Sequence, residues 1–197
     1  MDDENGDREV AQDFAGWHRR MLGHAGAPVY RALGRLDERL ALALNQWARQ
    51  SRATTRVVRV SAEHLAAVEV ALMLLLAVSG RRRSAFEMLV GVGVVYLACE
   101  ALGLVWPRAR PFERLTGIRG LTRHSAGRSF PSRHVASGLV MAAIGGEQHP
   151  RLGALMAAVA WWLGISRTMA GLHYPSDVAA GALLAVVTSR VRTWLHG

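Results

Sequence analysis

The amino-acid sequence predicts an all-α protein: an integral membrane helical bundle with five transmembrane helices and an N-terminal amphipathic helix. Three observations lead to this prediction. Hydrophobic residues make up 51% of the 197 residues, and after a polar start of about 56 residues they are gathered into five long apolar segments. Each segment approaches the length of ~20 residues that crosses a bilayer. Gly, Ala and Ser recur through all five segments, as helix packing in lipid favours.

The polar first part of the chain divides into two regions. We expect residues 1–28 to form a mobile tail, since they begin with an acidic, polar stretch that lacks the basic start and apolar run of a signal peptide. Residues 29–56 are expected to form an amphipathic helix and a linker, because apolar residues recur there at spacings of three and four. Such a helix either packs on its own protein or lies in the membrane interface. The apolar stripe consists of Leu33, Leu36, Leu40, Leu44 and Trp47.

Residues 57–197 are expected to form the membrane-embedded domain. A long, basic connection runs from Pro107 to Pro131 inside it, and connections of that length in a compact domain usually carry function. The expected spans are residues 57–79, 85–106, 132–148, 152–171 and 177–195.

The charge and the cysteine count exclude several classes of protein. The formal net charge is +9, and all 24 basic residues are Arg. Cys99 is the single cysteine, which excludes a disulfide scaffold and a Cys-x-x-Cys metal site. An excess of basic residues indicates one of three partners: nucleic acid, a membrane surface or an anionic substrate. The arginines gather around histidines and a helix start rather than along a strip of aromatic residues, so no nucleic-acid partner is expected.

The order of the spans places three polar clusters on one side of the membrane. With five spans that alternate in direction, the ends of the second and fourth face the same side as the starts of the first, third and fifth. The clusters are Arg108–Phe112, Phe130–His134 and Ser166–Asp177.

These clusters contain the residue types that phosphate chemistry needs. The guanidinium groups of several arginines can bind phosphoryl oxygens through bidentate hydrogen bonds. Ser132 follows Pro131 at the start of a helix, where free N–H groups and the helix dipole attract anions. His134 and His173 can supply one nucleophile and one general acid. Asp177, four residues after His173, could hold that imidazole in one tautomer and stabilise its positive charge.

In these residues the chain resembles the type 2 phosphatidic acid phosphatase superfamily of lipid phosphatases. The family pattern is K-x6-RP, then PSGH, then SR-x5-H-x3-D. This sequence has Arg110-Pro111, then Pro131 to His134, then Ser166-Arg167 followed at the family spacing by His173 and Asp177. The third motif matches in full, and the order and placement of the motifs on apolar helices also match.

The resemblance implies a mechanism and a set of roles. His173 attacks phosphorus and forms a phosphohistidine, Asp177 orients and charges it, and His134 protonates the leaving oxygen and later activates water. The phosphoryl oxygens are held by Arg110, Arg167 and Ser132. The resemblance implies no metal and no cofactor, since arginine cations take the part that magnesium plays elsewhere.

Two positions depart from the family pattern. The family Lys would fall at Gly103, and the chain contains no Lys; the Gly of PSGH is Arg133. Because a phosphoryl transition state still needs its charge neutralised, we expect Arg133 or Arg108 to supply the missing cation.

The phrases around the motifs are similar to bacterial undecaprenyl-diphosphate phosphatases of this superfamily, so a polyprenyl diphosphate or monophosphate is the expected substrate. Phosphatidic acid, phosphatidylglycerophosphate and polyprenyl phosphoribose phosphate are alternatives, as is a non-catalytic role in lipid binding or transport. The expected location is the bacterial plasma membrane, with the oligomeric state left open. The family resemblance implies an active site on the outer face. The positive-inside rule favours the cytoplasm instead, because only six arginines fall on the opposite side: Arg81, Arg82, Arg83, Arg151, Arg190 and Arg192.

Overall fold

The computed structural model describes residues 23–123 and 127–196, and within them it contains helices and one isolated bridge, between Ala109 and Arg128. The chain divides into two units, residues 1–39 and 40–197. The helices are α2 (Gly23–Ala48), α3 (Arg52–Val78), α4 (Arg82–Val105), α5 (Pro111–Arg114), α6 (Arg133–Gln148), α7 (Pro150–Met169) and α8 (Pro175–His196).

The first helix boundaries differ from those expected. Most of the expected tail lies outside the described residues, and its last residues, from Gly23, are helical. The linker is shorter than predicted: α3 begins at Arg52 rather than near residue 57. The reason is a helix cap, because Ser51 Oγ accepts a 3.0 Å hydrogen bond from the Thr54 N–H and satisfies the first turn.

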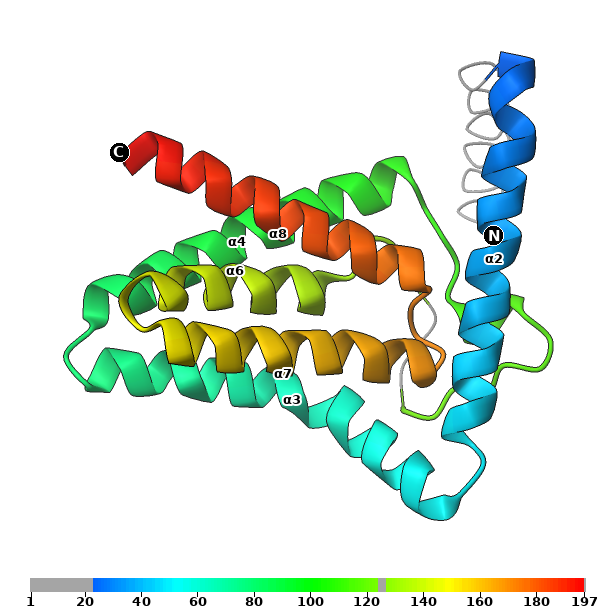
Figure 1. The fold of residues 1–197 in the computed structure, drawn as a ribbon, viewed down its shortest axis with the longest axis horizontal. Coiled ribbons are helices and arrows are strands. Elements are labelled where there is room, and N and C mark those ends of the chain that lie inside the picture. The colour runs from blue at the N-terminus through cyan, green and yellow to red at the C-terminus, as the bar shows by residue number, and fades with distance from the viewer. Residues whose placement is uncertain (1–22, 124–126, 197) are drawn as a thin grey trace, which may run out of the picture. The chain divides into compact units, whose positions relative to one another are not determined.

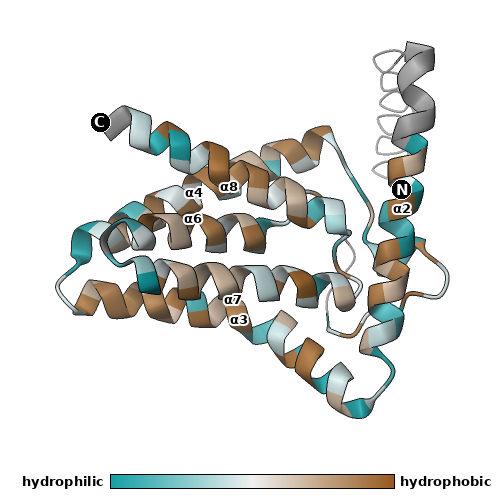
Figure 2. Cartoon of the chain, in the orientation of Figure 1, coloured by the Kyte–Doolittle hydropathy of each residue, from teal (hydrophilic) through white to brown (hydrophobic). Residues whose placement is uncertain are grey.

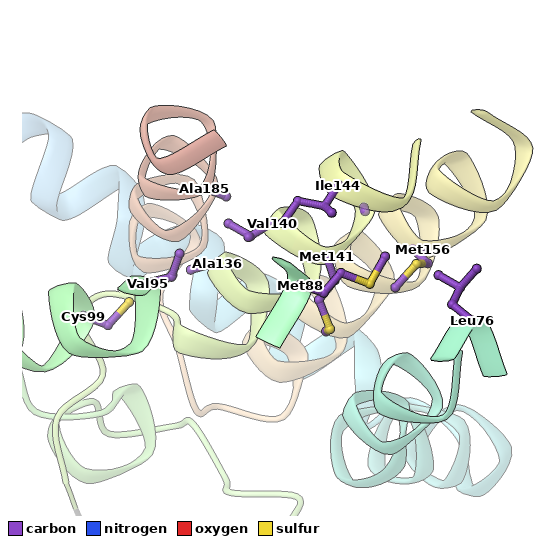
Figure 3. Packing of buried hydrophobic residues seen from close by; sticks show 11 residues of the cluster. Leu76, Met88, Val95, Cys99, Ala136, Val140, Met141, Ile144, Met156 and Ala185 are labelled. Atoms are coloured by element: carbon purple, nitrogen blue, oxygen red, sulfur yellow. The ribbon is translucent and has the colours of Figure 1, made fainter. Parts of the chain in front are cut away.

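Helix α6 occupies the middle of the bundle and contacts α3, α4, α7 and α8 (Figure 1). Figure 3 shows the core that it shares with α4, α7 and α8, built from Val95, Ala136, Val140, Met156 and Ala185 among others. Small residues permit this close approach. A Cβ atom at Gly181 of α8 would lie 2.5 Å from the Ser132 carbonyl oxygen at the start of α6, so glycine lets α8 approach that turn.

Many large apolar residues of the bundle are exposed, and Figure 2 shows hydrophobic residues along its long helices. Leu97 on α4 and Leu183 on α8 are more than 60% exposed, which is typical of residues that face lipid. Within the described residues α3, α4 and α7 are long and apolar enough to cross a membrane. These features confirm the all-α class and an integral membrane protein. The expected count of five spans is not established by hydropathy, because α6 and α8 do not meet the same criteria.

The apolar stripe of α2 is mostly exposed, but Leu44 packs against a buried cluster of the bundle. Leu40 and Trp47 are more than 40% exposed, whereas Asn45 is fully buried. The Asn45 amide nitrogen donates to the Arg119 and Met169 carbonyl oxygens at 2.9 and 2.8 Å. The end of α2 is thus joined to the long connection and to α7 by one polar side chain. The two interpretations of this helix from the sequence, packing on the protein and lying in the membrane interface, both stay predictions.

Candidate active site

The three polar clusters predicted from the sequence meet at one end of the bundle, where α4 and α7 end and α6 and α8 begin (Figure 1). Backbone hydrogen bonds join the clusters: Ser132 N–H donates to the Asp177 carbonyl at 2.9 Å, and Phe112 N–H donates to the Gly171 carbonyl at 3.1 Å. The argument that spans alternate in direction therefore predicted the meeting point correctly.

His173 lies in the turn between α7 and α8 and is almost completely buried. Its Nδ1 lies 2.7 Å from the Ser129 carbonyl oxygen, which accepts but cannot donate, so Nδ1 carries the proton. The lone pair is then on Nε2, which has no hydrogen-bond partner among the described residues. A buried imidazole that presents an unpartnered Nε2 lone pair is suited to nucleophilic attack.

Asp177 contacts several groups in and around the turn between α7 and α8, which contains His173 and Tyr174. Its Oδ2 accepts from the Tyr174 N–H at 2.8 Å and lies 3.9 Å from His173 Nδ1. Its Oδ1 accepts from Arg108 at 2.7 Å, and Arg108 also donates to Ser176 Oγ and lies 3.6 Å from the centre of the Tyr174 ring. The Nδ1 hydrogen bond expected for Asp177 is thus made by the Ser129 carbonyl. The carboxylate holds the turn that carries His173 through its bond from the Tyr174 N–H.

Two buried arginines flank the histidine. Arg110 Nη1 donates to the Leu172 carbonyl at 3.4 Å, and Arg167 Nη1 donates to the Ala62 carbonyl at 3.2 Å. Burial lowers the pKa of Arg110. Burial first, and then the charges of Arg167 and Arg110, lower the pKa of His173 well below 6.5. The site therefore holds a neutral imidazole beside two cations, which is an environment for an anion.

Ser132 and His134 lie at the start of α6. Ser132 is the N-cap, is fully buried, and its hydroxyl has no partner among the described residues. His134 is half-buried in the first turn, and its charge also lowers the pKa of His173, so the two imidazoles are close enough to interact. The two histidines, the helix start and the two buried arginines thus converge on one site.

The remaining two sequence-predicted arginines, Arg108 and Arg133, are held in ion pairs. Arg108 is held by Asp177 as described, and Arg133 donates to Glu100 and to the Tyr96 hydroxyl. The structure places a different cation beside Gly103. A Cβ built at Gly103 would lie 3.5 Å from Arg128 Nε, so the side chain of Arg128 covers that glycine. The sequence placed Arg128 only in the long connection, and its contact with Gly103 was not predicted because the two residues lie far apart along the chain.

The described residues contain no group of three or more His, Cys, Asp or Glu side chains arranged to hold a metal ion.

Comparisons with known proteins agree with this arrangement. The chain is 32% identical over 111 residues to the bacitracin transport permease protein BcrC of Bacillus licheniformis, covering 54% of this chain and 55% of that protein. It is 47% identical over 58 residues to a lipid A 1-phosphatase of Rhizobium johnstonii, covering 29% of this chain and 24% of that protein. The chain thus spans about half the length of the first relative and about a quarter of the second.

Two solved structures share the fold. LpxE of Aquifex aeolicus superposes with a TM-score of 0.64 at 20% identity, covering 78% of this chain and 92% of that one. A transmembrane PAP2-type phosphatidylglycerolphosphate phosphatase of Bacillus subtilis gives 0.65 at 20% identity, covering 84% and 86%. The family model of the PAP2 superfamily matches residues 84–197, which is more than half of the chain and includes every predicted motif. The chain belongs to the PAP2 superfamily.

Proposed function

We propose that this chain is a metal-independent lipid phosphatase that removes phosphate from a polyprenyl diphosphate of the undecaprenyl type through a phosphohistidine intermediate. The observation that carries the proposal is the buried His173, with its proton fixed on Nδ1 and its Nε2 unpartnered beside two buried arginines. Guanidinium groups supply the positive charge that phosphoryl transfer requires.

In the proposed first step, Nε2 of His173 forms a bond to the terminal phosphorus as the bond from phosphorus to the leaving oxygen breaks. His134 gives its proton to that oxygen. Arg110, Arg167 and the start of α6 at Ser132 bind the three phosphoryl oxygens. The Ser129 carbonyl and the Asp177 carboxylate stabilise the positive charge that develops on the His173 ring.

In the second step, His134 takes a proton from water, and the water oxygen attacks the phosphorus. The N–P bond breaks, and its electron pair returns to Nε2 of His173. Inorganic phosphate leaves, and both histidines regain their starting protonation. The two steps need the same pair of imidazoles at the same site, which fits their electrostatic coupling in the structure.

The lipid substrate is proposed from the similarity of the motif phrases to undecaprenyl-diphosphate phosphatases. The Rhizobium lipid A 1-phosphatase supports a second candidate, a lipid phosphomonoester such as phosphatidic acid or phosphatidylglycerophosphate. The name of the Bacillus relative, a transport permease protein, favours a non-catalytic alternative. We place the non-catalytic role last because His134, His173 and Asp177 are all present and converge.

We further propose that all five long helices of the bundle cross the bacterial plasma membrane, with the catalytic end on its outer face. A chain that crosses five times has the start of α3 and the start of α8 on the same side, as the bundle requires. The exposed apolar residues on α8, such as Leu183 and Val186, support its contact with lipid.

The proposal is tested by phosphate release from the detergent-purified protein in EDTA, with undecaprenyl diphosphate and phosphatidic acid as substrates. We expect release from both lipids to survive EDTA and to be faster from the diphosphate. Loss of activity in EDTA that added magnesium restores would contradict the metal-independent mechanism. Faster release from phosphatidic acid would make the lipid phosphomonoester the function, and no release from either lipid would leave the non-catalytic alternative.

The acid side of the pH profile gives a second prediction. Attack requires neutral His173, and because its pKa is lowered, the neutral form persists as the pH falls below 6.5. We expect kcat/KM to hold through pH 6.5 and to decline only below it. Arg167→Gln removes a charge that lowers this pKa, so the decline should move to higher pH. Both profiles use the same substrate, so ionisation of the substrate affects them equally. If the decline in kcat/KM lies at the same pH in Arg167→Gln as in wild type, it does not report the pKa of His173.

A further inference from the structure

A pocket of about 390 Å³ opens beside the candidate active site. Its size is within the range of small-ligand sites. Arg110 lines the pocket and also donates to the Leu172 carbonyl, next to His173, so this arginine connects the pocket to the turn that carries His173. The other lining residues that matter here are Glu100, Gly103, Arg128, Phe130 and Arg133.

Two arginines in this pocket converge on one carboxylate. Glu100 Oε2 accepts from Arg128 Nη2 at 3.0 Å, and Glu100 Oε1 accepts from Arg133 Nη1. Arg133 is also held by Tyr96, whose hydroxyl accepts at 3.0 Å and whose ring centre lies 5.1 Å from the guanidinium carbon. Each guanidinium has five N–H donors, and Glu100 accepts one hydrogen bond from each arginine. With Arg110 the pocket contains three positive charges and one negative charge, which favours an anion.

Gly103 makes room for one of these arginines. A Cβ atom there would lie 3.0 Å from the Phe130 carbonyl oxygen and 3.5 Å from Arg128 Nε. A longer side chain at position 103 would occupy the space that Arg128 now fills. The glycine at position 103, which departs from the family pattern, therefore leaves the room that the side chain of Arg128 occupies.

We propose that Arg128 and Arg133, positioned by Glu100, form a second phosphoryl subsite, which binds the non-reacting phosphoryl group of a lipid diphosphate while the terminal group lies at His173. This inference rests on the proposed phosphatase function and assigns its substrate class. The two phosphoryl groups of a diphosphate share one bridging oxygen, and two anion sites that share Arg110 suit such a pair. A monophosphate fills the catalytic site and leaves the second subsite without a ligand.

The test compares undecaprenyl diphosphate with undecaprenyl monophosphate, using wild type, Arg128→Ala and Arg133→Ala. Each arginine makes charge-assisted hydrogen bonds to the extra phosphoryl group, so each variant should lose about 10- to 100-fold in kcat/KM for the diphosphate, mostly through KM. The monophosphate should change by less than about threefold. Arg119→Ala is the matched control, because it removes the same charge from the exposed part of the same connection. Its activity on both lipids should equal that of wild type.

Inhibition gives a readout that does not depend on turnover of the two lipids. Methylenediphosphonate should inhibit wild type at lower concentration than inorganic phosphate does, and Arg128→Ala should lose that difference. Arg128→Lys serves if the alanine variant does not fold, and it should retain part of the preference, because an ammonium supplies the charge without the fork.

The outcomes separate this inference from the function on which it rests. Equal losses on both lipids, or no loss on either, would overturn the second subsite while the phosphatase stands. Wild type that hydrolyses the monophosphate and not the diphosphate would overturn it in the same way. Wild type that releases phosphate from neither lipid would contradict the proposed function itself.

Discussion

Substitution of His173 by alanine is expected to reduce phosphate release by about four to six orders of magnitude, because removal of a nucleophile costs that much in hydrolases that act through a covalent intermediate. His173 is the one imidazole among the described residues for which the structure shows both a fixed Nδ1 proton and a buried, unpartnered Nε2. The measurement is single-turnover phosphate release in EDTA. Incorporation of radiolabel from the terminal phosphate, quenched in alkali, detects the phosphoramidate directly.

Three further variants make this result specific. His173→Asn keeps an N–H that can donate to the Ser129 carbonyl but has no nucleophilic ring nitrogen, so it should be as inactive as the alanine variant while the turn stays folded. His64→Ala removes an exposed histidine from α3 and should retain full activity. His134→Ala should accumulate label on the protein, because its second step lacks the base. Labelled protein in the His173→Asn variant would place the nucleophile elsewhere.

Asp177→Asn is expected to damage both stability and catalysis. Asp177 is fully buried and ion-paired to Arg108 at 2.7 Å. The two carboxylate oxygens of Asp177 accept from Arg108 and from the Tyr174 N–H. An asparagine has only one acceptor oxygen, so its NH2 group would face one of these two donors and that hydrogen bond would be lost. Breaking a buried pair costs about 3 kcal/mol, which corresponds to a fall in Tm on the order of 10 °C for a chain of this size. The measurement is a thermal melt in detergent.

The catalytic loss has a separate cause. A carboxylate 3.9 Å from His173 Nδ1 stabilises the imidazolium that forms as phosphorus is attacked. At the effective dielectric constant of a protein site, the interaction of such a pair is about 4 kcal/mol or less, so kcat should fall by about two to three orders of magnitude. Ser176→Ala is the matched control, since it removes only a hydroxyl that accepts from the same Arg108. A kcat near wild type, measured well below the lowered Tm, would restrict Asp177 to a role in folding.

The sequence was sufficient to predict the helices and the end of the bundle where the chemistry gathers. Spans reverse direction, so polar clusters at alternate ends must meet, and Ser132 and His134 begin α6 as the Pro131-Ser132 pair predicted. Pro175 also indicated a turn between His173 and Asp177, and α8 does begin at Pro175. The partner of His173 Nδ1 was not predicted: the Ser129 carbonyl accepts the hydrogen bond that was expected for Asp177. A backbone carbonyl has no signature in the sequence.

Side-chain contacts between residues far apart in the sequence were the other feature that could not be predicted. The absence of lysine led to the hypothesis that Arg133 or Arg108 supplies the missing cation, which stays a prediction. The contact between Gly103 and the side chain of Arg128 was not predicted. The path of the connection from residue 107 to residue 131, which contains Arg128, depends on tertiary contacts, such as the bond from Asn45 to the Arg119 carbonyl, that no local pattern encodes.

The shortness of α6 has a consequence for how the substrate is supplied. Its 16 residues extend for about 24 Å, less than the ~30 Å hydrocarbon core of a bilayer. In the proposed orientation the catalytic residues at its start therefore lie at or below the headgroup plane. A lipid phosphate can reach them by lateral diffusion with its chain still in the membrane. Turnover then follows surface dilution: the rate depends on the mole fraction of the lipid in the bilayer or micelle, and the bulk concentration has little influence.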